Sequence, residues 1–140
     1  MRTFVAFPVE DPLLSYVTQL QNELKERGVK GKWVPPANQH LTVLFLGEQQ
    51  EHTVQELGEK LKQSLSGFQA FDMHPESVNT LGRPPRVLHL GWIESSQEKF
   101  ARLGNSIKQA AQEVQMELPE KVLERKPLPH LTFLRFRHKQ

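Results

Sequence analysis

Two short stretches of the chain place a threonine two residues after a histidine. The first is His40-Leu-Thr42 in "HLTVLFLGE", and the second is His130-Leu-Thr132 in "HLTFLRFRH". A neutral imidazole can take a proton from water, and an imidazolium can give one to a departing alkoxide. A threonine hydroxyl can donate a hydrogen bond to a phosphate oxygen. Two such pairs acting together supply the groups that hydrolysis of a phosphodiester needs, and this chemistry requires no metal.

The apolar residues around each motif predict a β-strand. Because side chains alternate along a strand, His40 and Thr42 share one face, while Leu41, Val43 and Phe45 share the core-facing side. Phe45 is therefore only a weak candidate for stacking on a base.

Helices and strands surround the two motifs in a repeated order. The pattern predicts strands at 3–9, 40–47, 86–93 and 126–136, helices at 10–28, about 52–67 and 95–115, and a loop-interrupted extended segment at 68–82. Asp11 is the expected N-cap of the first helix, and Ser95 or Ser96 that of the third.

This order predicts one domain over residues 1–140, built from two pseudo-repeats at about 1–67 and 68–140. A duplication of this kind favours a pseudo-two-fold arrangement around a central cleft. We therefore expect His40 and His130 to come together across that cleft.

Composition narrows the class of protein. A formal net charge of +2 suits an anionic ligand, but it falls short of the dense basic stripe of a duplex-DNA binder. The chain has no cysteine, which excludes disulfides, thiolate zinc sites and a cysteine nucleophile. His52, His74 and His89 lack metal-ligand spacing, and His89 is expected to have an ordinary packed or hydrogen-bonded role. Without a signal peptide or membrane span in the sequence, we expect a cytoplasmic protein.

The stretches "QHLTVLFLGE" and "PHLTFLRF" resemble the paired signatures of the two-histidine (2H) phosphoesterase superfamily. The opening "RTFVAFPVEDP" is similar to the first strand of its bacterial and archaeal branch, the LigT-like RNA 2′,3′-cyclic phosphodiesterases, also called 2′-5′ RNA ligases. The resemblance runs along nearly the whole chain. It implies a two-lobed α+β fold with antiparallel sheets and a cleft between the lobes.

The resemblance also implies roles for individual residues. His130 would be the base that activates water, His40 the acid that protonates the 3′ oxygen, and Thr42 and Thr132 the phosphate clamp; the two histidine roles could also be reversed. An arginine often follows the second motif in this family and binds phosphate, as Arg135 would here. Strict alternation, however, puts Arg135 on the face opposite His130, so a twist or bulge would have to bring it round.

One departure from the family is the C-terminus. Further strands usually follow the second motif, whereas eight residues (140 minus 132) follow Thr132 here, so we expect either a short variant or a truncated chain. Arg137, His138 and Lys139 make the end of the chain basic. Such termini are usually solvated, and we leave these residues out of the predicted site.

We therefore predict metal-independent hydrolysis of 2′,3′-cyclic phosphates to 2′-phosphomonoesters, with 2′-5′ RNA ligation as the reverse reaction. The predicted partners are RNA or nucleotides with cyclic phosphate ends. We expect no cofactor, no metal, no membrane contact and a monomer. One alternative is a binding module that holds nucleotides or RNA ends without turnover, and another is an esterase acting on a different cyclic phosphate.

Overall fold

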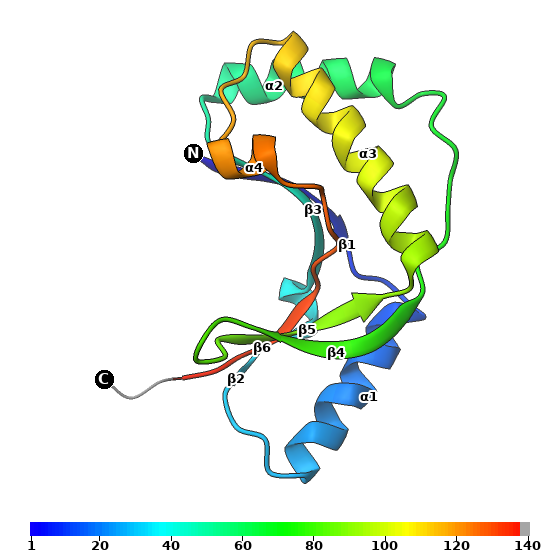
Figure 1. Ribbon diagram of the computed structural model, residues 1–140, viewed down its shortest axis with the longest axis vertical. Coiled ribbons are helices and arrows are strands. Elements are labelled where there is room, and N and C mark those ends of the chain that lie inside the picture. Colours follow the sequence, from blue (N-terminus) through cyan, green and yellow to red (C-terminus); the bar gives the residue numbers. More distant parts are fainter. Residues whose placement is uncertain (138–140) are drawn as a thin grey trace. The chain divides into compact units, whose positions relative to one another are not determined.

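A computed structural model describes residues 1–137 of the chain, which combine helices and strands (Figure 1). Its elements are β1 (Arg2–Pro8), α1 (Leu13–Glu26), β2 (Lys32–Trp33), a 3₁₀ turn (Pro36–Asn38), β3 (His40–Glu48), α2 (Glu51–Ser64), β4 (Pro75–Leu81), β5 (Val87–Trp92), α3 (Glu94–Glu113), α4 (Glu120–Glu124) and β6 (Thr132–Arg135). The strands form a two-stranded sheet, β1-β3, and a four-stranded sheet ordered β2-β6-β5-β4. The class is α+β, and β6 runs antiparallel to both of its neighbours, β2 and β5.

The chain divides into two compact units made of interleaved segments. The first unit contains residues 1–6, 42–74 and 92–129, and the second contains residues 7–41, 75–91 and those from 130 onward. Neither unit is a continuous stretch of sequence. The predicted division into repeats at 1–67 and 68–140 stays a prediction.

The first unit packs helices α2 and α3 on one side of the β1-β3 sheet (Figure 1). Its core is apolar: Leu46, Phe100 and Ile107 are all within 1% of full burial. An ion pair of 2.8 Å between Lys60 and Glu113 links α2 to α3 at the surface.

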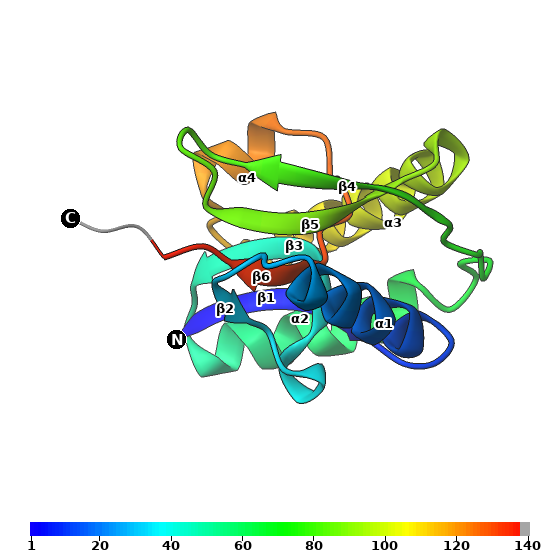
Figure 2. The same ribbon diagram turned by 90° about the horizontal axis from the view of Figure 1, so that it is seen from below.

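The second unit covers one face of the four-stranded sheet with α1 (Figure 1). Gln21 lies buried on this helix, and its side-chain amide donates to the carbonyl oxygens of Val34 and Phe133, at 3.0 Å each. These bonds tie the helix to strand β6 and to the residue that follows β2. In Figure 2, β4 and β5 run side by side as a hairpin next to β6.

Local predictions differ from the structure at several element ends. Helix α3 begins at Glu94 with Ile93 as its N-cap, and the Ser96 hydroxyl instead accepts a hydrogen bond from the His74 backbone N–H at 2.9 Å. Pro12 occupies the N-cap of α1, while the Asp11 carboxylate accepts from the Ser15 backbone N–H in the first turn. The second motif strand is shorter than predicted, and β2 and α4 were not predicted at all.

Candidate active site

The predicted site residues lie on strands β3 and β6, except His130, which stands two residues before β6. His40 opens β3, while Thr132 and Arg135 are the first and last residues of β6. His40, His130, Thr132 and Arg135 all belong to the second compact unit, whereas Thr42 belongs to the first. Both motif histidines are exposed and both threonines are half-buried, so all four side chains keep access to solvent.

Strand β6 contains an irregularity that decides which way Arg135 points. On β5, Leu88 pairs with Leu134 and His89 pairs with Thr132, so Phe133 has no direct partner there. Between these two pairs β6 contains one extra residue, Phe133, and β5 contains none, as in a β-bulge. Phe133 and Leu134 are consecutive and both fully buried, which confirms that alternation is interrupted between them.

After this buried doublet, Arg135 returns to the face of Thr132. Residues directly opposite each other in an antiparallel pair project to the same face of the sheet, and Val87 pairs with Arg135 as His89 pairs with Thr132. Val87 and His89 share a face by alternation, because Leu88 and Leu90 are buried on the opposite face of β5. The obstacle that strict alternation posed for Arg135 is therefore removed by the bulge.

The polar face of this sheet extends onto the other strands. Lys32 of β2 pairs with Arg135 and places a second cation in the same row. On β4, Ser77 and Asn79 lie so close to Gly91 that a side chain at Gly91 would collide with them. The face opposite α1 thus combines cations, hydroxyls, an amide and imidazoles, which are donors suited to an anionic ligand.

His89 lies beside His130, a proximity that the sequence analysis did not predict. Its ring meets the ring of His130 edge to face, with centroids 5.5 Å apart and planes at 77°. Its Nδ1 lies 3.2 Å from the Leu90 carbonyl oxygen, which can only accept, so Nδ1 carries the proton in this contact. The alternation of "VLHLGW" held a usable signal, because burial of the leucines leaves His89 on the polar face.

The environment of His130 favours its neutral form. His130 is exposed by its surface area, but protein atoms around the ring remove part of its water. This desolvation lowers the pKa of His130 below the ordinary 6.5, and the nearby His89 imidazole lowers it further. A neutral imidazole near neutral pH is the form that a general base requires.

The residue before His40 is anchored to the same sheet. Gln39 is buried, and its side-chain Nε2 donates to the Val34 carbonyl oxygen at 3.2 Å. The Val34 backbone N–H in turn donates to the carbonyl oxygen of Phe133 on β6. Two hydrogen bonds, from Gln39 to Val34 and from Val34 to Phe133, therefore connect the residue before His40 to strand β6.

The first motif has the same burial pattern as the second. Residues 40–45 and 130–135 both run exposed, buried, half-buried, buried, buried, exposed. In β3 the buried doublet is Val43 and Leu44, and the next residue, Phe45, is 37% exposed. The prediction that Phe45 lies on the core side is therefore wrong, for the same reason that strict alternation fails at Arg135.

The described residues lack both a cluster of metal ligands and a membrane-spanning helix. Among residues 1–137, no three His, Asp or Glu side chains gather as a group that could hold a metal ion. Within the same part of the chain, no helix combines the length and the apolar character that crossing a bilayer requires. The basic residues His138 and Lys139 lie outside the described residues.

Comparison with known proteins identifies relatives along the whole chain. The RNA 2′,3′-cyclic phosphodiesterase of Thermotoga maritima is 30% identical over 140 residues, which cover 99% of this chain and 71% of the relative. The protein of the same name from Archaeoglobus fulgidus is 38% identical over 110 residues, which cover 76% of this chain and 59% of the relative. This chain therefore spans less than two thirds of the length of the Archaeoglobus protein.

Solved structures show the same fold. The TT0787 protein of Thermus thermophilus matches with a TM-score of 0.77 at 24% identity, over 100% of this chain and 78% of that one. Escherichia coli LigT complexed with 3′-AMP matches with a TM-score of 0.70 at 20% identity, over 99% of this chain and 74% of that one. The family described as LigT like Phosphoesterase matches residues 7–89. On these grounds the chain belongs to the LigT-like phosphoesterase family.

Proposed function

We propose that this protein hydrolyses RNA or nucleotide 2′,3′-cyclic phosphates to 2′-phosphomonoesters. The observation that carries the proposal is the match to the Thermotoga RNA 2′,3′-cyclic phosphodiesterase over nearly the whole chain, a span that contains the positions of both His-x-Thr motifs. Escherichia coli LigT has been solved with 3′-AMP, which supports a nucleotide as the class of ligand. The polar face of the second unit suits the same anionic class.

In the proposed reaction, His130 takes a proton from water while the water oxygen forms a bond to phosphorus. The bond from phosphorus to the 3′ oxygen breaks, and His40 gives its proton to that oxygen. Each proton transfer of this kind contributes roughly a hundred- to ten-thousand-fold in rate. The lowered pKa of His130 supports the base role for this residue rather than the reversed assignment.

Three further residues would hold the phosphate. The hydroxyls of Thr42 and Thr132 donate to its non-bridging oxygens, and the Arg135 guanidinium pairs with the same charge through its forked donors. The return of Arg135 to the face of Thr132 supports its inclusion. His89 would act through His130, as a positioning residue.

The wider features of the proposal come from the sequence. The pseudo-two-fold duplication around a central cleft is the arrangement that would let both motifs act on one phosphate. Because a catalyst lowers the barrier in both directions, the same groups would also support 2′-5′ ligation. A monomeric state, a cytoplasmic location and independence of metal stay predictions.

The decisive experiment measures turnover of an RNA oligomer with a 2′,3′-cyclic phosphate end in excess EDTA, with the position of the product phosphate resolved. We expect a 2′-phosphate from the wild type. His40→Ala and His130→Ala should each lower the rate by roughly a hundred-fold or more, because each removes one proton transfer.

The matched control is His52→Ala, which removes an exposed histidine of α2 that belongs to neither motif. It should keep the wild-type rate. Folded wild-type protein that binds the oligomer without hydrolysing it would instead establish a binding module.

A further inference from the structure

Gly91 stands on strand β5 at the level of His130. The Leu90 backbone N–H donates to the carbonyl oxygen of Leu131 at 3.1 Å, within the antiparallel pairing of β5 with β6. The next step of this register brings Gly91 opposite His130. The Cβ positions of two residues that oppose each other in this way lie roughly 5 Å apart and on one face of the sheet.

Two polar side chains of the neighbouring strand β4 occupy the space above Gly91. A Cβ atom at this position would collide with the hydroxyl oxygen of Ser77 and with the amide nitrogen of Asn79. Both residues are exposed, so their polar atoms are open to solvent and to a ligand. The missing side chain of Gly91 thus lets strand β4 place two polar groups beside His130.

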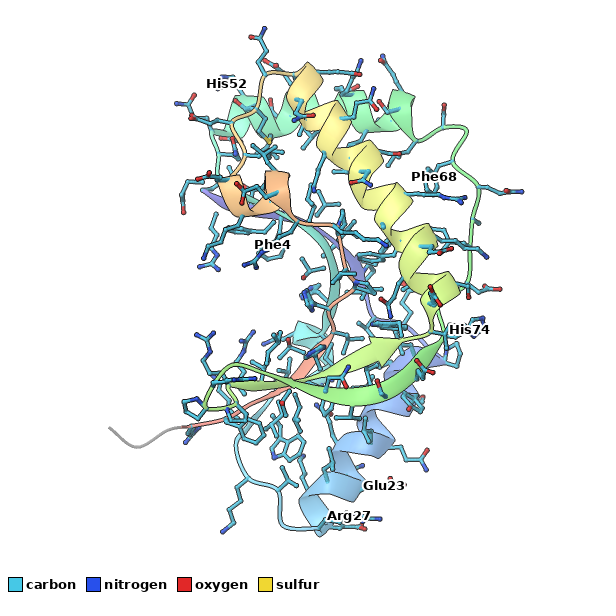
Figure 3. All side chains as sticks on the ribbon, in the orientation of Figure 1. Phe4, Glu23, Arg27, His52, Phe68 and His74 are labelled. Carbon is cyan, nitrogen blue, oxygen red and sulfur yellow. The ribbon has the colours of Figure 1, made fainter. Side chains whose placement is uncertain are left out.

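This space lies on the polar face of the four-stranded sheet. Gly91 follows His89 by two residues on β5, so the two positions share a face, and the buried residues between and beyond them point the other way. Helix α1, on which Figure 3 labels Glu23 and Arg27, covers the opposite face. The hydroxyl and the amide from β4 are therefore on the same face as both imidazoles.

Serine and asparagine on an exposed strand are ordinary surface residues, and alone they would carry no function. Here, within residues 1–137, neither the Ser77 nor the Asn79 side chain makes a hydrogen bond to another protein group. A glycine in a strand interior costs backbone entropy and often marks a place where another group approaches closely. The chain thus uses a glycine where it admits two unbonded polar groups next to a histidine of the candidate site.

A general base acts best on a water molecule whose orientation is fixed. One O–H of the water points to the base, and a lone pair of its oxygen must face phosphorus. The second O–H then needs an acceptor of its own, and the oxygen of a hydroxyl or of a side-chain amide can serve. Orientation that is set before the reaction raises the rate.

We propose that Ser77 and Asn79 hold the attacking water beside His130. This water site rests on the proposed function, in which His130 is the base, and it adds two residues to that reaction. The water oxygen forms a bond to phosphorus, and one water proton passes to His130. The bond to the 3′ oxygen breaks, and that oxygen takes the proton of His40. The second water proton stays on the oxygen that joins phosphorus, where Ser77 or Asn79 accepts its hydrogen bond.

Methanol is the probe for this site, because it can attack the same phosphate but has only one O–H. Adenosine 2′,3′-cyclic phosphate in a mixture of water and methanol, with excess EDTA, gives the 2′-phosphate from water and its methyl ester from methanol, and chromatography resolves the two products. The double variant Ser77→Ala/Asn79→Ala should raise the ratio of ester to 2′-phosphate by about two- to ten-fold, because water loses a hydrogen bond that methanol never made. The kcat for hydrolysis should fall by a similar factor, and KM should stay unchanged.

Ser15→Ala/Asn22→Ala is the matched control, since it removes the same two chemical groups from exposed positions of α1. It should leave the product ratio and kcat at their wild-type values. If the double variant in β4 does not fold, as judged by circular dichroism, Ser77→Ala and Asn79→Ala are measured singly.

A product ratio that stays at the wild-type value in the β4 variants, with or without detectable ester, would overturn the water site. A rise in KM with kcat and the product ratio unchanged would also overturn it, because these residues would then contact the substrate and not the water. Either result leaves the proposed function standing, since the wild type still hydrolyses the cyclic phosphate. Folded wild type that turns over no cyclic phosphate would overturn both proposals together.

Discussion

At the scale of single residues, the contact between His89 and His130 has a consequence for pH dependence. A general base must be neutral to act, so the lowered pKa of His130 lets it act as a base at lower pH. His89 opposes protonation of His130 only while it carries a positive charge itself. Arg135 on β6 and Lys32 on β2 also place positive charge on this sheet face, and within residues 1–137 neither contacts His130 in the way that His89 does.

We predict that His89→Gln raises the pKa of His130 toward 6.5 without reaching it, since desolvation, the larger cause, remains. The acidic limb of kcat/KM should move to higher pH by the same amount. NMR titration of the His130 ring in labelled protein measures the pKa directly. His74→Gln, at an exposed histidine of the first unit, is the control and should shift neither quantity. An unmoved His130 titration would show that His89 does not act on it.

The same shift has a stability counterpart. Because the pKa of His130 is lower in the folded protein than in the unfolded chain, the unfolded chain binds more protons below pH 6.5. The free energy of unfolding contributed by this residue is therefore present above that pH. It is lost as the pH falls from 6.5 toward the folded-state pKa. Urea unfolding of wild type and His130→Gln across this window would measure the difference.

At the scale of elements, two glycines in helix interiors have opposite surroundings. Gly104 of α3 faces Pro127, and a side chain at this position would collide with the proline ring, whereas Gly58 of α2 has nothing within 4 Å. We expect Gly104→Ala to destabilise the protein by about 1–3 kcal/mol through overpacking. Gly58→Ala should stabilise it by about 0.5–1 kcal/mol, because alanine loses less backbone entropy in a helix.

Chemical denaturation of the two glycine variants checks this pair of predictions. Pro127 stands three residues before His130, so the close approach at Gly104 fixes the segment that leads into the second motif. Equal effects of the two substitutions would mean that the packing of α3 against Pro127 does not limit stability.

The link from α1 to strand β6 depends on one buried side chain. Gln21→Ala removes two hydrogen bonds of 3.0 Å, to Val34 and Phe133. Both carbonyl oxygens keep another donor, so we expect a loss of about 1–2 kcal/mol in the free energy of unfolding rather than the full cost of an unpaired buried group. Gln19→Ala, an exposed glutamine on the same helix, should stay within about 0.5 kcal/mol of wild type in urea unfolding.

At the scale of the whole molecule, the interleaving of the two units makes the halves of the sequence dependent on each other. Strand β2 lies before residue 67, while its partner β6 lies after it. Helices α2 and α3 pack together, although α2 also lies before residue 67 and α3 after it. We predict that fragments 1–67 and 68–140 do not fold alone. Thermal unfolding followed by circular dichroism should be cooperative for the full chain and not for either fragment, and a cooperative transition in one fragment would contradict this.

The sequence predicted the features that local patterns record. Both motifs and the three long helices follow from periodicity and repetition along the chain, whereas the α+β class was implied by the family resemblance. Strand β2 has two residues and α4 has five, which is too short to produce a periodic signal. The proximity of His89 to His130 depends on the register between β5 and β6, which is a long-range pairing that no local pattern encodes.

The two buried doublets were not predictable for a different reason. "VL" at 43–44 and "FL" at 133–134 are apolar at both positions, so their composition is compatible with continued alternation and with a bulge. Only the pairing of β6 with β5 and the burial of both residues distinguish these cases. The orientation of Phe45 and Arg135 therefore had to come from the structure.

The doublet in β6 determines which kinds of mutation the gene can tolerate. A substitution at Phe133 or Leu134 changes one side chain and leaves the direction of all the others intact. Insertion of one codon there, with the bulge kept, shifts Arg135 by one step of the alternation and turns it toward the core, which would bury a guanidinium among apolar residues. Deletion of one codon removes the bulge but leaves Arg135 two residues after Thr132, on the same face. The same holds for Val43 and Leu44 ahead of Phe45. Over evolutionary time these strands can accept point mutations, but they are closed to the gain of a single residue.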